Sequence, residues 1–188
     1  MRSITDIHDY YCARIKEVKG YAKSGDPWVF LMAASYIDYL VRMVYNVEQS
    51  TSNNYKKFIK DYLSLINPLY KDFVYQCGLE DLPEQMYHVL RCGIVHGFSL
   101  VPDKHGMKKG GRKRSILLGH KINGDIHFAK IVTTDYDSVL FTAEDFTEDL
   151  DKLLDKIFVD IAPHDSILTN NIINWVNMYP PIMSISID

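Results

Sequence analysis

Two side chains near the end of one predicted helix have types and spacing suited to acid–base and anion chemistry. Arg91 and His96 stand five residues apart in the segment LRCGIVHG, which covers residues 90–97. Histidine titrates near neutral pH and can accept or donate a proton. Arginine keeps its charge and presents forked donors to an anion. Because Gly97 is a natural helix terminator, we expect a helix over 84–96 that carries both side chains.

The apolar pattern of this helix predicts which side faces the core. With steps of about 100° from Met86, one side gathers five small or apolar residues, and Arg91 falls at roughly 140° and His96 at roughly 280°. The two side chains therefore border the opposite side, with the apolar Val95 between them. Such a strip is better suited to an interface than to water. The five residues expected on the core side are Met86, Val89, Leu90, Gly93 and Ile94.

The segment resembles the signature of HEPN domains, in which an Arg is followed five residues later by a His near the end of a bundle helix. The apolar helix predicted over 27–46, with Asp38 inside it, also resembles the earlier core helix of that family. The resemblance implies a four- or five-helix bundle that forms a homodimer, with two copies of the Arg/His segment meeting at the interface. Many such proteins are metal-independent endoribonucleases of toxin–antitoxin or antiviral systems, and others are catalytically inactive.

In an active member, Arg91 and His96 would be the catalytic residues, and no cofactor or metal would be needed. The 2′-hydroxyl of the RNA would attack the neighbouring phosphate, with His96 as general base or acid and Arg91 bracing the developing charge. Cys92 follows Arg91, where active members usually carry a polar residue, often Asn. That feature favours the alternative, a non-catalytic bundle that dimerises or binds a nucleotide or a partner protein.

Asp38 and Arg42 are charged exceptions in the apolar helix over 27–46, one turn apart. They could support Arg91 or His96 from the neighbouring helix, and Cys92 could do so from the same helix. Alternatively, Asp38 and Arg42 form a local ion pair that satisfies two charges in apolar surroundings. Both interpretations stay open from the sequence.

A strongly basic segment follows the Arg/His helix directly. It could grip RNA phosphates beside the site, with strong dependence on salt, or it could be a solvated loop. Its cationic residues are Lys104, Lys108, Lys109, Arg112, Lys113 and Arg114.

The composition is that of an ordinary globular protein, with 188 residues, 47% hydrophobic, 24% charged and a net charge of −3. We expect one domain over 1–188 that is cytoplasmic and independent of membranes, because no long apolar run occurs. The three cysteines are widely spaced and lack a Cys-x-x-Cys motif, which argues against disulfides and a zinc site. The histidines outside the Arg/His helix show no ligand spacing. RNA, a second copy of the chain and an antitoxin or regulatory protein are the expected partners.

Hydrophobic periodicity predicts a mainly helical bundle interrupted at about 98–141 by the basic loop and a β-hairpin or small antiparallel sheet. Helical spacing marks the segments 4–23, 27–46, 55–66, 146–158 and about 165–179. Asn123-Gly124 between apolar runs predicts the hairpin turn, and a third strand is expected near 139–141. His120 and His127 lie on either side of this turn, where we expect them at the surface.

Overall fold

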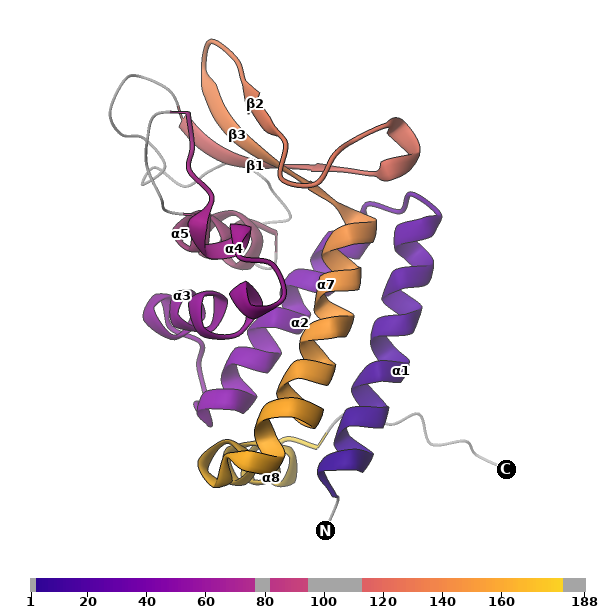
Figure 1. Ribbon diagram of the computed structural model, residues 1–188, viewed down its shortest axis with the longest axis vertical. Helices are drawn as coiled ribbons and strands as arrows, with labels where there is room; N and C mark the ends of the chain where they lie inside the picture. The colour runs from indigo at the N-terminus through magenta and orange to yellow at the C-terminus, as the bar shows by residue number, and fades with distance from the viewer. Residues whose placement is uncertain (1–2, 77–81, 95–112, 181–188) are drawn as a thin grey trace.

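The computed structural model describes residues 3–76, 82–94 and 113–180. Three long helices lie side by side, with a small sheet across one end and a further helix across the other (Figure 1). The three are α1 (Ile4–Lys23), α2 (Trp28–Tyr45) and α7 (Ala143–Asp155), and the crossing helix is α8 (Ser166–Met178). The structure confirms the predicted mainly helical class.

Local signals in the sequence account for where these helices begin. Ser3 caps α1, since its hydroxyl accepts a hydrogen bond from the Asp6 backbone while the Asp6 carboxylate accepts one from the Ser3 backbone. Asp165 caps α8 by accepting from the backbone N–H groups of Ile167 and Leu168. Each cap satisfies backbone donors that the first helical turn leaves unpaired.

Short helices cover one flank of α2, and others continue α7. On the flank lie α3 (Ser52–Asp61), η1 (Leu63–Leu65), α4 (Leu69–Asp72), α5 (Leu82–Gln85) and η2 (Met86–Ile94). After α7 come η5 (Lys156–Ile161) and η6 (Ala162–His164).

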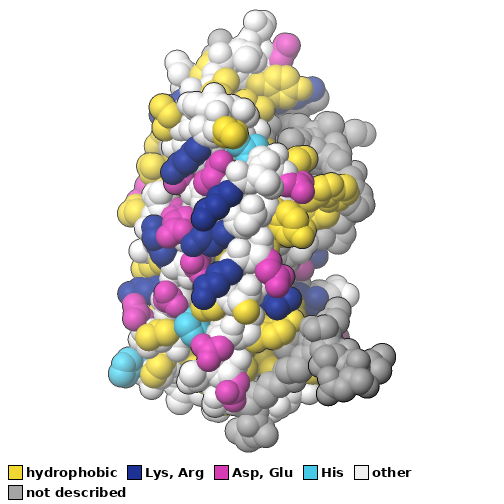
Figure 2. Space-filling view, turned by 90° about the vertical axis from the view of Figure 1, so that its right-hand side faces the viewer, with side chains coloured by type: hydrophobic (Ala, Val, Ile, Leu, Met, Phe, Trp, Pro, Cys, Tyr) yellow, Lys and Arg dark blue, Asp and Glu magenta, His cyan; other side chains and the backbone are white. Residues whose placement is uncertain are grey.

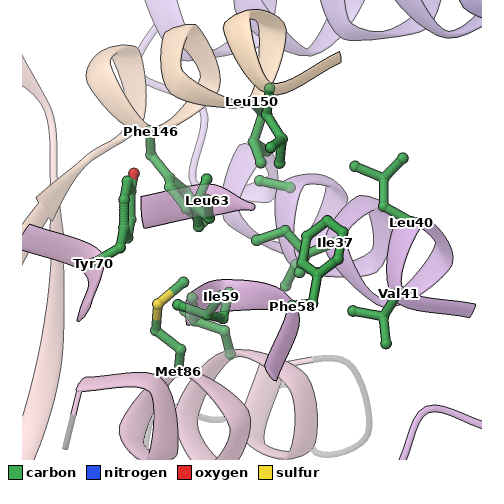
Figure 3. Close-up of a cluster of buried hydrophobic side chains, with 14 of the residues drawn as sticks. Ile37, Leu40, Val41, Phe58, Ile59, Leu63, Tyr70, Met86, Phe146 and Leu150 are labelled. Atoms are coloured by element: carbon green, nitrogen blue, oxygen red, sulfur yellow. The ribbon is translucent and has the colours of Figure 1, made fainter. Parts of the chain in front are cut away.

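Apolar side chains from α2 and its flank meet those of α7 in one core (Figure 3). Ile37, Phe58 and Phe146 are fully buried there. The same cluster of buried residues extends to Val139 and Phe141 in the sheet. Helices and sheet therefore share one hydrophobic core, so displacement of either would expose the other.

The sheet is mixed and has three strands in the order β1-β3-β2. The strands are β1 (Lys113–Gly119), β2 (Lys130–Val132) and β3 (Tyr136–Thr142). β3 pairs parallel with β1 and antiparallel with β2. As the central strand, β3 is buried from Asp137 to Thr142, as expected for a strand covered on both faces.

The predicted hairpin across Asn123-Gly124 is wrong. The dipeptide ends a short 3₁₀ turn, η4 (Lys121–Asn123), with Gly124 at φ 80°, and the segments before and after it do not pair. After β1 the chain turns back on itself, where the His120 backbone N–H donates to Asp125 at 3.0 Å. Asn-Gly favours a turn, but long-range pairing with β3 decides which strands become neighbours.

The helix predicted over 84–96 also differs from expectation in its described part. The short α5 is followed by the π-helix η2, whose hydrogen bonds run from residue i to i+5 instead of i+4. The angles calculated with α-helical steps therefore do not apply to Met86–Ile94. Met86, Val89 and Leu90 are nonetheless fully buried.

The face dominated by α1 carries charges of both signs in alternation (Figure 2). Lys19 of α1 lies 2.6 Å from Glu148 and 2.7 Å from Asp151, both on α7. Opposite charges are thus paired along the seam between the two helices, and this face is not a cationic surface for a polyanion.

Among the described residues, no helix combines the length and the apolar character that a membrane crossing requires.

Candidate functional site

Arg91 projects from η2 toward α2, where it meets Asp38. Its Nε donates a hydrogen bond to Asp38 Oδ1 at 3.2 Å, and each side chain is 19% exposed. The contact joins residues that are 53 positions apart in the chain. Asp38 lies on α2 and Arg91 on η2, so the contact forms only when these two helices pack against each other.

Two tyrosines surround this ion pair. Arg91 Cζ lies 5.7 Å from the centre of the Tyr87 ring, a distance at which a cation and an aromatic ring attract each other. The ring of Tyr55, from α3, meets Tyr87 edge to face at 5.7 Å. Tyr55 is fully buried, and among the described residues its hydroxyl has no hydrogen-bond partner. Burying a hydroxyl without a hydrogen bond is costly, and several other described side chains, Tyr45 and Trp175 among them, also bury a polar atom in this way.

Burial keeps both phenols of this cluster protonated, and the Asp38 charge keeps the arginine ionised. Burial lowers the pKa of Arg91, but the hydrogen bond and charge of Asp38 outweigh it, and the net shift is upward. Burial first, and then the Asp38 charge, raise the pKa of Tyr55. Burial and Cys92 raise the pKa of Tyr87. The cluster therefore offers one fixed cation and two phenol donors, and no tyrosinate base.

Cys92 belongs to this cluster. Its side chain is half-buried, and hydrogen bonds with Cys92 contribute to the raised pKa values of both Arg91 and Tyr87. Tyr87 and Cys92 are five residues apart, and the i to i+5 repeat of a π-helix stacks such positions.

A second set of charges lies beside the cluster, and the sequence analysis missed it. Glu84 of α5 accepts hydrogen bonds from Lys56 of α3 at 2.6 Å and from His88 of η2 at 2.8 Å. Burial opposes ionisation of Glu84, yet Lys56 and His88 lower its pKa overall. The spacing of Glu84 and His88, four residues apart in a predicted helix, was the available signal.

The other predicted site residues that the structure describes are Arg42, Lys113 and Arg114. Arg42 does not pair with Asp38; its Cζ lies 4.9 Å from the centre of the Trp175 ring, on α8. Lys113 begins β1, with Nζ 6.0 Å from the Tyr136 ring, and Arg114 is buried in β1 at 7% exposure. Arg114 thus contributes no exposed cation. His96, Lys104, Lys108, Lys109 and Arg112 lie outside the described residues.

A separate polar chain connects the sheet to α7, and it contains a histidine expected at the surface. His127 Nδ1 accepts from the Thr142 backbone at 3.0 Å, and its Nε2 lies 3.4 Å from the Tyr70 hydroxyl, which donates to Asp149 at 3.0 Å. Burial lowers the pKa of His127 to about 4 and raises the pKa of Asp149. Neither histidine lies at the surface as predicted, since His127 is half-buried and His120 is 9% exposed.

Comparisons of the chain with protein-family models, with curated proteins and with solved structures gave no match. The fold, a helical protein with a small mixed sheet, and the geometry around Arg91 therefore carry the functional argument.

Proposed function

We propose that this protein is a metal-independent endoribonuclease of the HEPN type that acts as a homodimer, with Arg91 and His96 as its catalytic pair. The observation that carries the proposal is the position of Arg91, which Asp38 holds by its Nε on a π-helical segment. π-Helical turns occur frequently at functional sites.

Asp38 binds the Arg91 guanidinium only through Nε, which leaves the two Nη groups available to bind a phosphate. The hydrogen bond to Asp38 and the Tyr87 ring restrict the orientation of Arg91 before any substrate arrives. A phosphate would meet the two Nη groups, whose forked donors match its oxygens. Groups oriented in advance cost no reorganisation when charge develops in the transition state.

A partly buried ion pair is itself an indication of function. Removing two charges from water is costly, and apolar residues of similar volume often stabilise a fold as well or better. Asp38 and Arg91 are each 19% exposed and lie beside the core. We take the retention of such a pair as support for a role of Arg91 beyond stability.

In the proposed reaction, the RNA 2′-oxygen forms a bond to phosphorus while the bond to the 5′-oxygen breaks. His96 accepts the proton of the 2′-hydroxyl or donates a proton to the leaving 5′-oxygen, and Arg91 stabilises the charged phosphorane between these events. The products are a 2′,3′-cyclic phosphate and a 5′-hydroxyl. In a homodimer the two copies of His96 can divide the acid and base roles.

Cys92 supports the alternative, a non-catalytic bundle that dimerises or binds a nucleotide or partner protein. Its interactions raise the pKa values of Arg91 and Tyr87, so the thiol is an integral part of the cluster. Under this alternative the Asp38–Arg91 pair would order an interface or bind an anion without chemistry.

The test is RNA cleavage in the presence of EDTA by the purified chain and by Arg91→Ala and His96→Ala. Arg14→Ala and His164→Ala are matched controls, since Arg14 is 50% exposed in a surface pair and His164 is exposed on η6. We expect both site variants to lose cleavage while remaining folded dimers by circular dichroism and light scattering, and both controls to retain it. Intact RNA with wild type, or equal cleavage by the site variants, would overturn the proposal.

A further inference from the structure

Three side chains of different ligand types converge where the first half of α1 meets the end of α7. His8 Nε2 lies 2.8 Å from Asp155 Oδ1 and 3.2 Å from Cys12 Sγ. One ligand atom from each of the three side chains lies within 4.8 Å of the other two. An imidazole, a thiol and a carboxylate thus surround a single point.

Their convergence follows from the packing of two helices. His8 and Cys12 are four residues apart on α1, so they share one face of that helix. Asp155 is the last residue of α7, which runs alongside α1 (Figure 1). Neighbours on the same face of α1, Tyr11 and Ile15, are buried in the core and hold the backbone in place.

The separations fit a small divalent ion that prefers nitrogen and sulfur. Zinc binds imidazole, thiolate and carboxylate at about 2.0–2.3 Å, and its tetrahedral geometry places ligand atoms roughly 3.2–3.7 Å apart. Two of the three separations, 2.8 and 3.2 Å, would have to open by about half an ångström or less, and the third pair of ligand atoms lies within 4.8 Å. Rotation of the Asp155 side chain, which is 68% exposed, can supply that movement.

Two surrounding features bear on the orientation of the His8 ring. His8 Nδ1 lies 3.7 Å from Asp9 Oδ1, beyond hydrogen-bond distance, so the exposed Asp9 side chain would have to rotate slightly to orient the ring as carboxylates do at metal-bound histidines. The His8 ring also lies 5.8 Å from the Phe158 ring, which limits its rotation. His8 further lines a hollow of about 410 Å³ with Thr5 and Phe158, where water can reach a fourth coordination position.

We propose that His8, Cys12 and Asp155 form a zinc site that fastens α1 to the end of α7, with water as the fourth ligand. Binding releases the Cys12 thiol proton to solvent, moves the His8 ring proton from Nε2 to Nδ1 so that Nε2 becomes a ligand, and replaces three of the waters bound to Zn²⁺ with the three side chains. The ion would link helices that the apolar core and surface ion pairs otherwise hold together. The site does not depend on the proposed ribonuclease activity, which is tested with EDTA present and involves other elements.

The experiment is titration of the purified full chain with Co²⁺ in chelator-free reducing buffer, followed by displacement with Zn²⁺. Co²⁺ reports a thiolate ligand by a charge-transfer band in the near ultraviolet and tetrahedral geometry by its visible bands. We expect saturation at one ion per chain and loss of both signals when Zn²⁺ is added. Thermal unfolding should occur at a higher temperature with Zn²⁺ than with EDTA, because a ligand that binds only the folded state stabilises it.

Variants assign the site to these residues. Cys12→Ser should abolish the charge-transfer band, and His8→Gln should weaken Zn²⁺ affinity by more than about 100-fold, while Asp9→Asn should weaken it roughly tenfold. Cys92→Ser is the matched control for metal binding, since Cys92 is also a free, half-buried cysteine, and it should keep the Co²⁺ charge-transfer band of wild type. Absence of the band in wild type, its persistence in Cys12→Ser, or its loss in Cys92→Ser would overturn the proposal.

Discussion

Burial lowers the pKa of two basic side chains of this protein, Arg91 and His127, but their net pKa shifts are opposite. At the flank of α2, Arg91 faces Asp38, and the pKa of Arg91 rises. Beneath the sheet, His127 faces backbone and the Tyr70 hydroxyl, and burial lowers its pKa to about 4. A direct partner of opposite charge preserves ionisation, whereas neutral hydrogen-bond partners leave desolvation to favour the neutral form.

The difference indicates separate roles for the two regions. Since His127 Nδ1 accepts a backbone hydrogen bond, its neutral form carries the proton on Nε2, directed to the Tyr70 oxygen. The Tyr70 hydroxyl donates in turn to Asp149. These connected hydrogen bonds pair the His127 ring nitrogens and the Tyr70 hydroxyl, and they join the sheet to α7. The Asp38–Arg91 pair instead keeps a charge at a partly exposed position, as anion binding requires.

Arg91→Lys should have the largest effect. Lysine keeps the charge but has neither the Nε bonded to Asp38 nor the planar fork, so we expect cleavage of RNA to fall at least about 100-fold. Rates measured in EDTA with Arg14→Lys as control would check this. Unchanged cleavage would show that the contact with Asp38 does not position a catalytic group.

The pH dependence of stability should report His127. Its folded pKa of about 4 lies below the ordinary 6.5, so between these values only the unfolded chain is protonated. Stability therefore falls as pH decreases from 6.5 to 4, by up to about 3 kcal/mol, and this group causes no further loss below pH 4. The pKa of Asp149 is raised in the folded protein, so its protonation increases stability as the pH decreases through the acid range.

Urea unfolding of wild type and His127→Asn at pH 7 and pH 5 separates the two contributions. Asparagine retains an acceptor for the Thr142 backbone but does not titrate, and the Asp149 contribution largely cancels between the proteins. We expect wild type to lose more stability between the two pH values than the variant does. Equal losses would mean that His127 is not held neutral in the fold.

Asp38→Asn should lower the free energy of unfolding by about 2 kcal/mol, because it leaves the Arg91 charge partly buried without a counter-charge. Asp61→Asn is the control, since Asp61 pairs with Lys57 at the surface and is 42% exposed. It should change stability by less than about 0.5 kcal/mol. Similar values for both, from urea unfolding at pH 7, would place the Asp38–Arg91 pair among ordinary surface pairs.

Gly119→Ala should have the smallest effect, a loss of about 1–2 kcal/mol. A Cβ at the end of β1 would lie 2.1 Å from Asp125 Oδ2, whose carboxylate accepts from the His120 backbone. In α1, by contrast, a Cβ at Gly20 meets nothing within 4 Å. Gly20→Ala should therefore be neutral or stabilise by up to about 1 kcal/mol. Equal thermal stability of the two variants would contradict this account of the turn after β1.

The long helices could be predicted because their pattern is local. Ile7, Tyr11, Ile15 and Val18 recur at helical spacing and are all buried in α1. The predicted helix over 27–46 corresponds to α2, which ends at Asn46 in the left-handed conformation. Such helices bury one continuous stripe, and a stripe is visible in the sequence without knowledge of its partner.

The sheet and the surroundings of Arg91 could not be predicted in the same way. Asn123-Gly124 favours a turn locally, yet β1 pairs with β3, although β2 lies between them in the sequence. From the sequence, Asp38 could form an ion pair with Arg42, one turn away on the same helix, or with a residue of another element. Only the packing of η2 on α2 directs it to Arg91, and only the packing of α8 provides Trp175 for Arg42.

The sequence by itself determined the helical class, the approximate positions of the long helices and the residue types available for chemistry, since each depends on neighbours within a few positions. Tertiary structure decided which charges meet, which histidines are buried and how the strands are ordered. Those outcomes depend on contacts between residues far apart in the chain, such as Asp38 with Arg91 and His8 with Asp155. Desolvation and pairing, which set the pKa values, arise only when those contacts form.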